Sequence, residues 1–236
     1  MKQFLLLTTI VVFLINCKKD SPRLIDSNYK PDVSPAKFTN STNITNPYYP
    51  LAAGKKYIYE GQTDEGLERV EEQRLSTTKT ILGITCIVGY FKAYVNNKLV
   101  EETWDWYAQD NDGNLWYFGE EVNNFNPDGS LKDHGGSWEA GKDGAQPGLI
   151  MPAILQVGYK YREEYYFNHA EDEAEIIGTG LTVTIPLGTY TNCIKTKNWT
   201  ALEPDAMENK IYAPGIGLIK EINITDNFEI KLVMIQ

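Results

Sequence analysis

Carboxylates carry most of the chemistry that this sequence could perform. Acidic residues gather at Glu68, Glu71 and Glu72, and again from Glu171 to Glu175. A glycoside hydrolase uses two such groups on opposite sides of a scissile bond. The sequence places no pair of them across a cleft, and charge-rich runs are usually solvated faces of a fold. We therefore expect these clusters to be solvated and not catalytic.

A second set of carboxylates has the spacing of a calcium loop. Asp110 and Asp112 alternate with asparagine and are followed by Gly113. An EF-hand would need a bidentate carboxylate from Glu121, but residues 115–119 have the pattern of a strand. An Asp-Gly centre between two alternating runs is instead typical of a β-hairpin turn, in which aspartate caps the backbone. The pattern favours a turn, and Asp110 with Asp112 is only a weak candidate for a metal site.

Motifs for nucleophilic, metal-dependent or phosphate chemistry are missing from the sequence. It contains no G-x-S-x-G, H-E-x-x-H, C-x-x-C or Walker motif. Its two histidines, His134 and His169, lie far apart, each in a polar stretch. A catalytic triad or zinc site would need partners that nothing nearby provides. We predict that the chain is not an enzyme and binds no cofactor.

Tryptophans are the strongest candidates for ligand binding. Trp104, Trp106 and Trp116 flank one predicted hairpin, and Trp138 lies in a glycine-rich stretch further on. Alternation along a strand places Trp104 and Trp106 on the same face. Such a face could stack sugars or line a lipid groove. The alternative is that these rings fill the inner face of a sheet.

The elements that must position these residues are β-strands. Short alternating runs rich in Tyr, Trp, Ile, Val and Thr are separated by Gly, Asn, Asp and Pro. Examples are residues 55–60, 85–95, 101–108 and 115–119. No stretch longer than about ten residues has a clean helical period. The sequence predicts an all-β antiparallel fold.

The chain also repeats a set of landmarks in the same order. The matched segments are Pro50–Tyr59 with Pro152–Tyr161, Thr78–Ile87 with Thr182–Ile194, and Tyr107–Glu120 with Tyr212–Glu221. We predict two pseudo-repeated β-meanders, roughly residues 48–122 and 150–236. Each would have one apolar face to cover. They would therefore form one curved sheet, a half-barrel or a sandwich within a single β-domain over 48–236.

Two features of this arrangement stay open in the sequence. Cys86 and Cys193 fall at equivalent places in the halves, so they could form a disulfide or act as two buried small hydrophobes. The halves are linked by a long loop over 123–149 whose glycines and prolines exclude regular structure over most of its length. This loop is either functional or a crossover that Trp138 pins to the core.

The N-terminus resembles the signal of a bacterial lipoprotein. The apolar run Phe4–Ile15 is too short to cross a bilayer and has the length of a secretory signal. Leu14-Ile15-Asn16-Cys17 resembles a lipobox, although Asn16 departs from the small residue usual there. The resemblance implies a signal peptide over 1–16 and lipidation of Cys17, whose thiolate is a strong nucleophile.

Residues 17–47 are rich in Pro, Ser, Asn and Asp, which predicts a flexible tether. Within it, Lys18-Lys19-Asp20 resembles a signal for the outer face of the outer membrane. We therefore expect a bacterial cell-envelope protein, held in the outer membrane through Cys17. The net charge of −10 argues against a nucleic-acid partner.

The mature chain also resembles a family of uncharacterised bacterial secreted proteins and lipoproteins. The residues that carry the likeness are Tyr49-Pro50-Leu51 with Gly54, Tyr57 and Tyr59, the segment 136–148, and Tyr212–Glu221. A more distant analogy is to periplasmic lipoprotein-carrier half-barrels. These likenesses imply a non-catalytic β-domain that binds a ligand or partner, such as a lipid-like small molecule. The competing hypotheses are a structural or surface-interaction lipoprotein with a fully packed core and, third, an envelope hydrolase.

Overall fold

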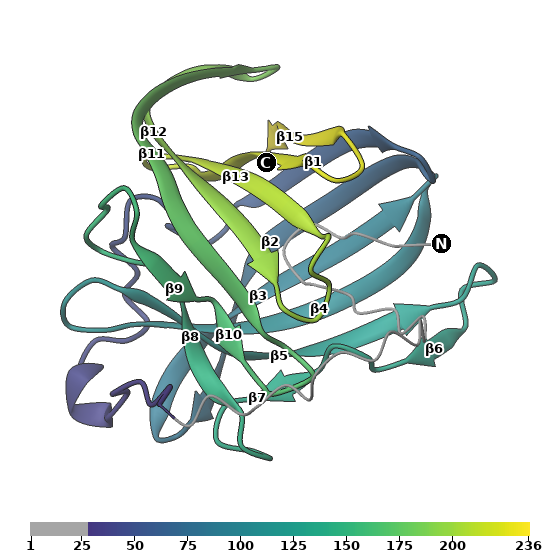
Figure 1. Ribbon diagram of the computed structural model, residues 1–236. Helices are drawn as coiled ribbons and strands as arrows, with labels where there is room; N and C mark the ends of the chain where they lie inside the picture. The colour runs from purple at the N-terminus through teal and green to yellow at the C-terminus, as the bar shows by residue number, and fades with distance from the viewer. Residues whose placement is uncertain (1–27) are drawn as a thin grey trace.

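The computed structural model describes residues 28–236, which form one strongly curved antiparallel sheet (Figure 1). A short 3₁₀ helix, η1 (Pro35–Lys37), precedes the strands. The strands are β1 (Lys56–Thr63), β2 (Gly66–Ile81), β3 (Ile84–Val95), β4 (Lys98–Gln109), β5 (Leu115–Phe125), β6 (Leu131–Asp133), β7 (Trp138–Glu139), β8 (Gln146–Met151), β9 (Lys160–Arg162), β10 (Glu164–Tyr165), β11 (Asp172–Ile185), β12 (Gly188–Thr200), β13 (Met207–Ala213), β14 (Gly217–Asn223) and β15 (Phe228–Ile235). Over residues 28–236, no helix has the length and apolar character needed to cross a membrane.

Both halves of the chain follow the same path through this sheet. Strands β1 to β5 pair in sequence order, and β8 adds to β5. Strands β9, β11, β12, β13, β14 and β15 repeat the path, and β15 pairs with β1 to join the halves. Cys86 of β3 and Cys193 of β12 occupy equivalent strands, where both thiols are buried and free. The predicted pair of meanders in one curved sheet is confirmed.

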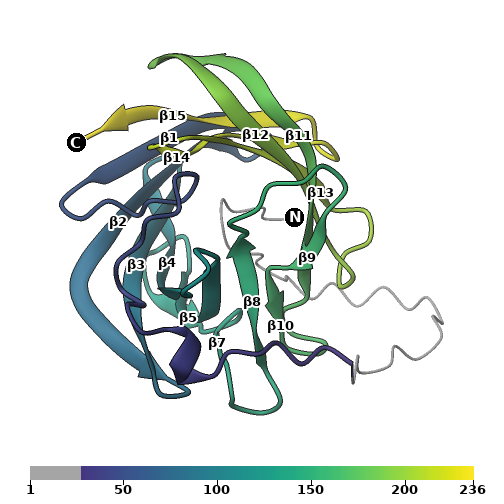
Figure 2. The ribbon, with the colours of Figure 1, turned by 90° about the vertical axis from the view of Figure 1, so that its left-hand side faces the viewer.

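The two ends of the sheet meet at a bend in the chain around Glu163. Before the bend, β9 pairs with β11 through Tyr161 and Ala174. Directly after it, β10 pairs with β8 through Glu164 and Pro147. Because one bent segment continues both edges, the sheet curves nearly into a barrel (Figure 2). It therefore has an inner face and an outer face.

Residues 28–47 run along the outside of the sheet beside β3 and β5 (Figure 2). The Phe38 ring meets the ring of Phe118 edge-on, with 5.8 Å between centroids. The Ser41 hydroxyl donates a hydrogen bond to the carbonyl of Thr85. The prediction of a flexible tether is thus wrong for 28–47, because one buried aromatic ring and side-chain hydrogen bonds hold a polar segment in place. Residues 1–27, with the predicted signal peptide, lipobox and Cys17, lie outside the described residues.

The segment that begins at Pro47 crosses one end of the curved sheet. The backbone N–H of Gly215, after β13, donates to the carbonyl of Pro47 at 2.7 Å. The Tyr49 ring lies 5.6 Å from the ring of Tyr107 on β4 and 6.2 Å from that of Tyr212 on β13. Tyr49 therefore connects the two halves at this end.

The long loop predicted over 123–149 contains strands instead. β5 continues to Phe125, and β6, β7 and β8 each return to pair with it. Gly129 (φ 86°) and Gly141 (φ 86°) lie in the turns between them. Glycine takes this backbone conformation at little cost. The glycines that suggested an irregular loop serve tight reversals between short strands.

The closure of the sheet can be tested at Gly148 of β8. A Cβ at this position would overlap the backbone carbonyl of Glu163, which cannot move without breaking the pairing of β8 with β10. We expect Gly148→Ala to lower the free energy of unfolding by about 3 kcal/mol in urea denaturation. Gly178→Ala in β11, where a Cβ meets only the flexible Leu181 side chain, should change it by less than about 1 kcal/mol. Equal effects of the two variants would contradict closure at this bend.

Candidate ligand-binding interior

Strand register identifies the side chains on the inner face. Residues directly opposite each other on paired strands share a face. By this rule Asp105 of β4 lies beside Glu120 of β5, and Lys210 of β13 lies beside Glu221 of β14. Burial raises the pKa of Glu120, and the charge of Asp172 on β11 adds to the rise although β5 and β11 are not neighbours in the sheet. These side chains therefore face one another across the interior.

The interior is strongly acidic. The buried polar side chains of residues 28–236 include nine carboxylates but a single lysine, Lys210. The buried carboxylates are Glu68, Glu72, Glu101, Asp105, Glu120, Glu163, Glu164, Glu171 and Glu221. A carboxylate is costly to bury unless it is paired, hydrogen-bonded or protonated. The fold must meet that cost in one of these ways, or a ligand must.

Both clusters of acidic residues that the sequence predicted to be solvated contribute to this interior. Glu68 and Glu72 are buried on the inner face, whereas Glu71 between them points outward. On β11, Asp172 points inward and Glu173 points outward. The expectation that these clusters are solvated is wrong for the inward members. A strand divides consecutive residues between two faces, so a charged run need not be exposed as a whole.

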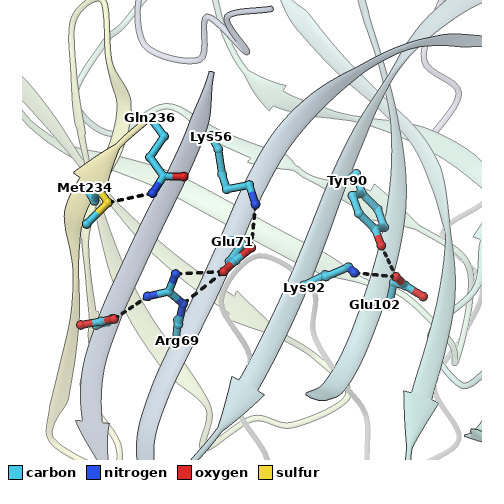
Figure 3. Close-up of polar contacts among 9 residues, drawn as sticks. Lys56, Arg69, Glu71, Tyr90, Lys92, Glu102, Met234 and Gln236 are labelled. Atoms are coloured by element: carbon cyan, nitrogen blue, oxygen red, sulfur yellow. Dashed lines mark hydrogen bonds and ion pairs between the residues drawn. The ribbon is translucent and has the colours of Figure 1, made fainter. Parts of the chain in front are cut away.

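On the outer face, carboxylates are matched by cations (Figure 3). Glu71 accepts from Lys56 at 3.0 Å and from Arg69 at 2.9 Å, and Lys92 lies 3.4 Å from Glu102. A shallow groove of about 100 Å³ lies among these groups, lined by Lys56, Glu71, Gln73, Tyr90, Lys92 and Tyr94. Its charges neutralise one another in contact with solvent, where such pairs contribute little. The outer groove therefore has no charge left for a ligand to balance.

The first half of the chain builds an acid–aromatic cluster on the inner face. Its members are Asp105, Tyr107, Tyr117, Glu120, Trp138 and Glu164. The hydroxyls of Tyr117 and Tyr107 donate to the two oxygens of Asp105 at 2.9 and 3.0 Å. The Trp138 indole N–H donates to Glu164 at 3.0 Å. The Trp138 ring also meets the Tyr117 ring edge-on, with 5.4 Å between centroids. One connected set of contacts therefore holds both Asp105 and Glu164.

Electrostatics in this cluster favour protonated carboxyl groups. Burial raises the pKa of Asp105 to about 8, and the hydrogen bonds from the two tyrosines lower it only in part. Burial and the neighbouring charges of Asp105 and Glu164 hold the pKa of Glu120 well above its usual range. Burial also raises the pKa of Glu72 to about 7. At neutral pH these carboxyl groups therefore tend to hold protons that the same groups would release in water.

The second half of the chain supplies its own cation at the equivalent place. The residues Lys210-Ile211-Tyr212-Ala213 align with Asp105-Trp106-Tyr107-Ala108, so Lys210 replaces Asp105. The lysine lies directly opposite Glu221, as Asp105 lies opposite Glu120. The charges of Glu163, Glu208 and Glu221 outweigh burial and raise the pKa of Lys210. One half is thus partly neutralised from within, and the other places two acids side by side.

Several buried polar atoms have no hydrogen-bond partner among residues 28–236. They include one carboxylate oxygen each of Glu120, Glu163 and Glu221. The other oxygen of Glu163 accepts from Asn198 at 2.9 Å. The Tyr161 hydroxyl on β9 is likewise buried without a partner. Such atoms lie in both halves, and in the first half Glu120 lies directly opposite another acid, Asp105.

Two of the predicted tryptophan candidates lie outside this interior. Trp104 and Trp106 share a face, as predicted, but it is the outer one, and Asp105 between them points inward. The Trp104 ring lies 5.1 Å from that of Tyr90. The Lys79 ammonium lies 3.2 Å from the centre of the Trp106 ring. The alternative that the rings fill the inner face is therefore wrong for Trp104 and Trp106, because alternation gives shared faces but not which face is inside.

The other two candidates differ from each other. Trp116 donates its indole N–H to Asp110 at 2.8 Å and packs beside the hairpin turn. Trp138 is buried and belongs to the acid–aromatic cluster. Of the four predicted ring residues, Trp138 is the one that the structure brings to the inner acids. Asp105 and Glu120 were missed, although a polar residue between two tryptophans was a usable sign of a two-faced strand.

Asp110 acts as the cap of a turn. Its carboxylate accepts from the backbone N–H groups of Asp112 at 3.0 Å and Asn114 at 2.9 Å, and Gly113 has φ 88°. The predicted hairpin between β4 and β5 is confirmed. In the part of the chain that the structure describes, no group of three His, Cys, Asp or Glu side chains is arranged to hold a metal ion.

The two histidines are placed away from the inner acids. His134 lies with its Nδ1 2.9 Å from the carbonyl of Val122. The His169 ring stacks on Tyr166 at 4.1 Å between centroids. The inner carboxylates converge, as a hydrolase would need, but these histidines have other partners.

Comparisons with known proteins add no family. No family model and no curated protein matches the chain. One similar solved structure is of a protein described as exported, with a YmcC-like fold, from Bacteroides fragilis NCTC 9343, at 14% identity and a TM-score of 0.47 over 80% of this chain and 98% of that one. Another is of a protein described as a lipoprotein from Parabacteroides distasonis ATCC 8503, at 12% identity and a TM-score of 0.43 over 81% and 99%.

The raised carboxyl pKa values predict a pH dependence of stability. Between about pH 4 and pH 8 the folded protein keeps protons that unfolded carboxyl groups release near pH 4. Stability should therefore be greatest at the acid end of this window and fall as pH rises through the folded pKa of Asp105, about 8. Thermal unfolding across the window measures this, and Asp105→Asn should flatten the slope.

Glu71 gives the matched control, because its ion pairs with Lys56 and Arg69 outweigh burial and lower its pKa. Glu71→Gln should leave the slope between pH 5 and pH 8 unchanged. A melting temperature that rises with pH in the unsubstituted protein would contradict this account of the interior.

Proposed function

We propose that this chain is a lipid-anchored cell-envelope protein that binds a small polar ligand on the inner face of its sheet without chemical change. The observation that carries the proposal is the set of buried carboxylate oxygens of Glu120, Glu163 and Glu221 that no donor in residues 28–236 reaches. A buried acceptor without a partner costs about 1–3 kcal/mol. A ligand that donates hydrogen bonds to these oxygens removes that cost.

The size of the sheet supports a ligand in the interior. The path through the sheet runs over thirteen strands before its ends meet. Closed barrels of about eight strands are just wide enough for their own side chains to fill, and the diameter grows with strand number. A sheet of this width can enclose more than its side chains.

The chemistry of the inner face favours a polar ligand over an acyl chain. Asp105, Glu120 and Glu164 would each lose hydration to methylene groups that give no hydrogen bond in return. The lipid-like ligand that the sequence suggested thus has less support than a hydrogen-bond donor. The competing function, a structural protein with a packed core, is favoured by the complete burial of Tyr59, Tyr107 and Tyr212.

The anchor is proposed on the sequence Leu14-Ile15-Asn16-Cys17. Because the Tyr29 ring packs against Tyr165 and its hydroxyl donates to the carbonyl of Pro147, about ten residues separate the lipid from the domain. At about 3.5 Å per residue this reaches roughly 40 Å. The protein would then be held close to its membrane leaflet, which we propose is that of the outer membrane.

Lipidation is tested by Cys17→Ser. We expect this variant to move from the membrane fraction to the soluble fraction and to lose metabolic labelling with palmitate. Cys193→Ser, which removes a free buried thiol, should keep both properties. Membrane association of Cys17→Ser equal to that of the unsubstituted protein would overturn the anchor and leave the binding proposal standing.

Ligand binding is tested by native mass spectrometry of the protein isolated from its own envelope under gentle conditions. We expect a non-covalent adduct of small mass that is lost on denaturation. Because the adduct would depend on the inner acids, it should also be lost in Glu120→Gln and kept in Glu71→Gln. An unliganded mass under all gentle conditions would instead support the structural protein.

A further inference from the structure

Because the chain contains an internal repeat, the same site occurs in two versions, one in each half. In the second half, Lys210 lies directly opposite Glu221 on the neighbouring strand, and its ammonium lies 3.8 Å from the carboxylate of Glu208. In the first half, the matching position is Asp105, directly opposite Glu120. Lys210 and Asp105 each lie two residues before matching tyrosines, Tyr212 and Tyr107. The same scaffold therefore carries a cation at one site and lacks it at the other.

The surroundings of Asp105 suit the binding of a cation beside its carboxylate. The side chains around the carboxylate are aromatic and offer ring faces as well as hydroxyls: Tyr107 and Tyr117 stack at 5.1 Å between centroids. Aromatic faces attract ammonium groups, and more strongly when water is excluded. Glu120 is only 5% exposed, and one of its oxygens has no partner among residues 28–236. Glu120 is the counterpart of Glu221, the acid opposite which the second half places Lys210.

Building on the proposed function, we infer that the acid–aromatic cluster binds the primary ammonium group of a small organic cation, which takes the place that Lys210 occupies in the other half. On binding, the ammonium would displace the protons that Asp105 and Glu120 hold, which pass to solvent, and its three N–H donors and positive charge then match two adjacent carboxylates. A quaternary ammonium has no N–H to donate, so it would leave the Glu120 oxygen without a partner. A bare metal ion is disfavoured, because the described residues form no group of ligands for one.

A water-sized space lies next to this cluster. It has a volume of about 10 Å³ and is lined by Tyr49, Pro50, Leu51, Tyr57, Tyr59, Glu72, Ile216, Gly217 and Leu218. A space of this volume holds roughly one water molecule or one ammonium group. The Tyr49 hydroxyl lies 3.5 Å from that of Tyr107, which donates to Asp105. A single layer of tyrosines thus separates this space from the cluster.

The inference is tested by calorimetric titration of the purified protein with butylamine hydrochloride at neutral pH. The comparison ligands are butanol, which has the stem without the charge, and tetramethylammonium chloride, which has the charge without the donors. We expect butylammonium to bind at least tenfold more tightly than either. Glu120→Gln should weaken that binding at least tenfold, and the outward-facing Glu71→Gln should leave it unchanged.

Asp105→Lys gives a second test, because it is read out by the melting temperature as well as by the loss of binding. If the ammonium of the ligand replaces a lysine, this variant should raise the melting temperature and abolish butylammonium binding together. Asp105→Asn, which removes one charge without adding a cation, should weaken binding without that gain in stability. Should Asp105→Lys fail to fold, or fold and still bind the amine, the equivalence with Lys210 is overturned.

The outcomes separate this inference from the proposed function. If native mass spectrometry shows a neutral or anionic adduct and butylammonium does not bind, the ammonium site falls while the binding function stands. Equal binding of butanol or tetramethylammonium also overturns the inference, because the hydrogen-bonding charge would then not matter. If neither an adduct nor amine binding is found, both proposals fail.

Discussion

The closure of the sheet at Glu163 is the constraint on which the rest of this structure depends. Because one short segment pairs with β11 on one side and with β8 on the other, the two ends of a long sheet meet. Closure removes the inner face of most strands from water. An acid on that face is desolvated, which raises its pKa, whereas the same residue one position along the strand stays hydrated and pairs with a lysine. The contrast between inner Glu72 and outer Glu71 follows from this alone.

Charge is consequently sorted by face. Lys56, Arg69 and Lys92 all serve acids on the outer face (Figure 3), where solvent already screens the charges and the gain is small. The interior, where a cation would have the greatest effect, receives Lys210. Stability alone would favour more cations in the interior and fewer on the outer face, because buried acids without cations raise the free energy of the folded state. An arrangement that gives up stability at one place is typical of a binding site.

The sequence predicted the scaffold better than the site. The landmarks shared by Pro50–Tyr59 and Pro152–Tyr161 were sufficient to identify two meanders, because apolar alternation and turn glycines are local signals. The site depends on which face closes inward, and that is decided by the pairing of Tyr161 with Ala174 far along the chain. Alternation therefore grouped Trp104 with Trp106 correctly but could not show that Asp105, not the tryptophans, points inside. The segment 28–47 was misjudged because its composition gave no sign of the pocket that receives Phe38.

The repeat also bears on how the buried acids should be understood. Buried acids occur in both halves, but if two directly opposed acids were only a tolerated defect of the fold, both halves would be expected to carry such a pair, since both have the same strand path and the same opposed positions. They do not: Lys210 lies opposite Glu221, whereas Asp105 lies opposite Glu120. The second half shows that this scaffold accepts a lysine at the position, so the first half is not prevented from having one by space or by backbone geometry. An aspartate held there by two tyrosine hydroxyls is an ordered acceptor, and an ordered acceptor without an internal cation is best explained by a cation that comes from outside.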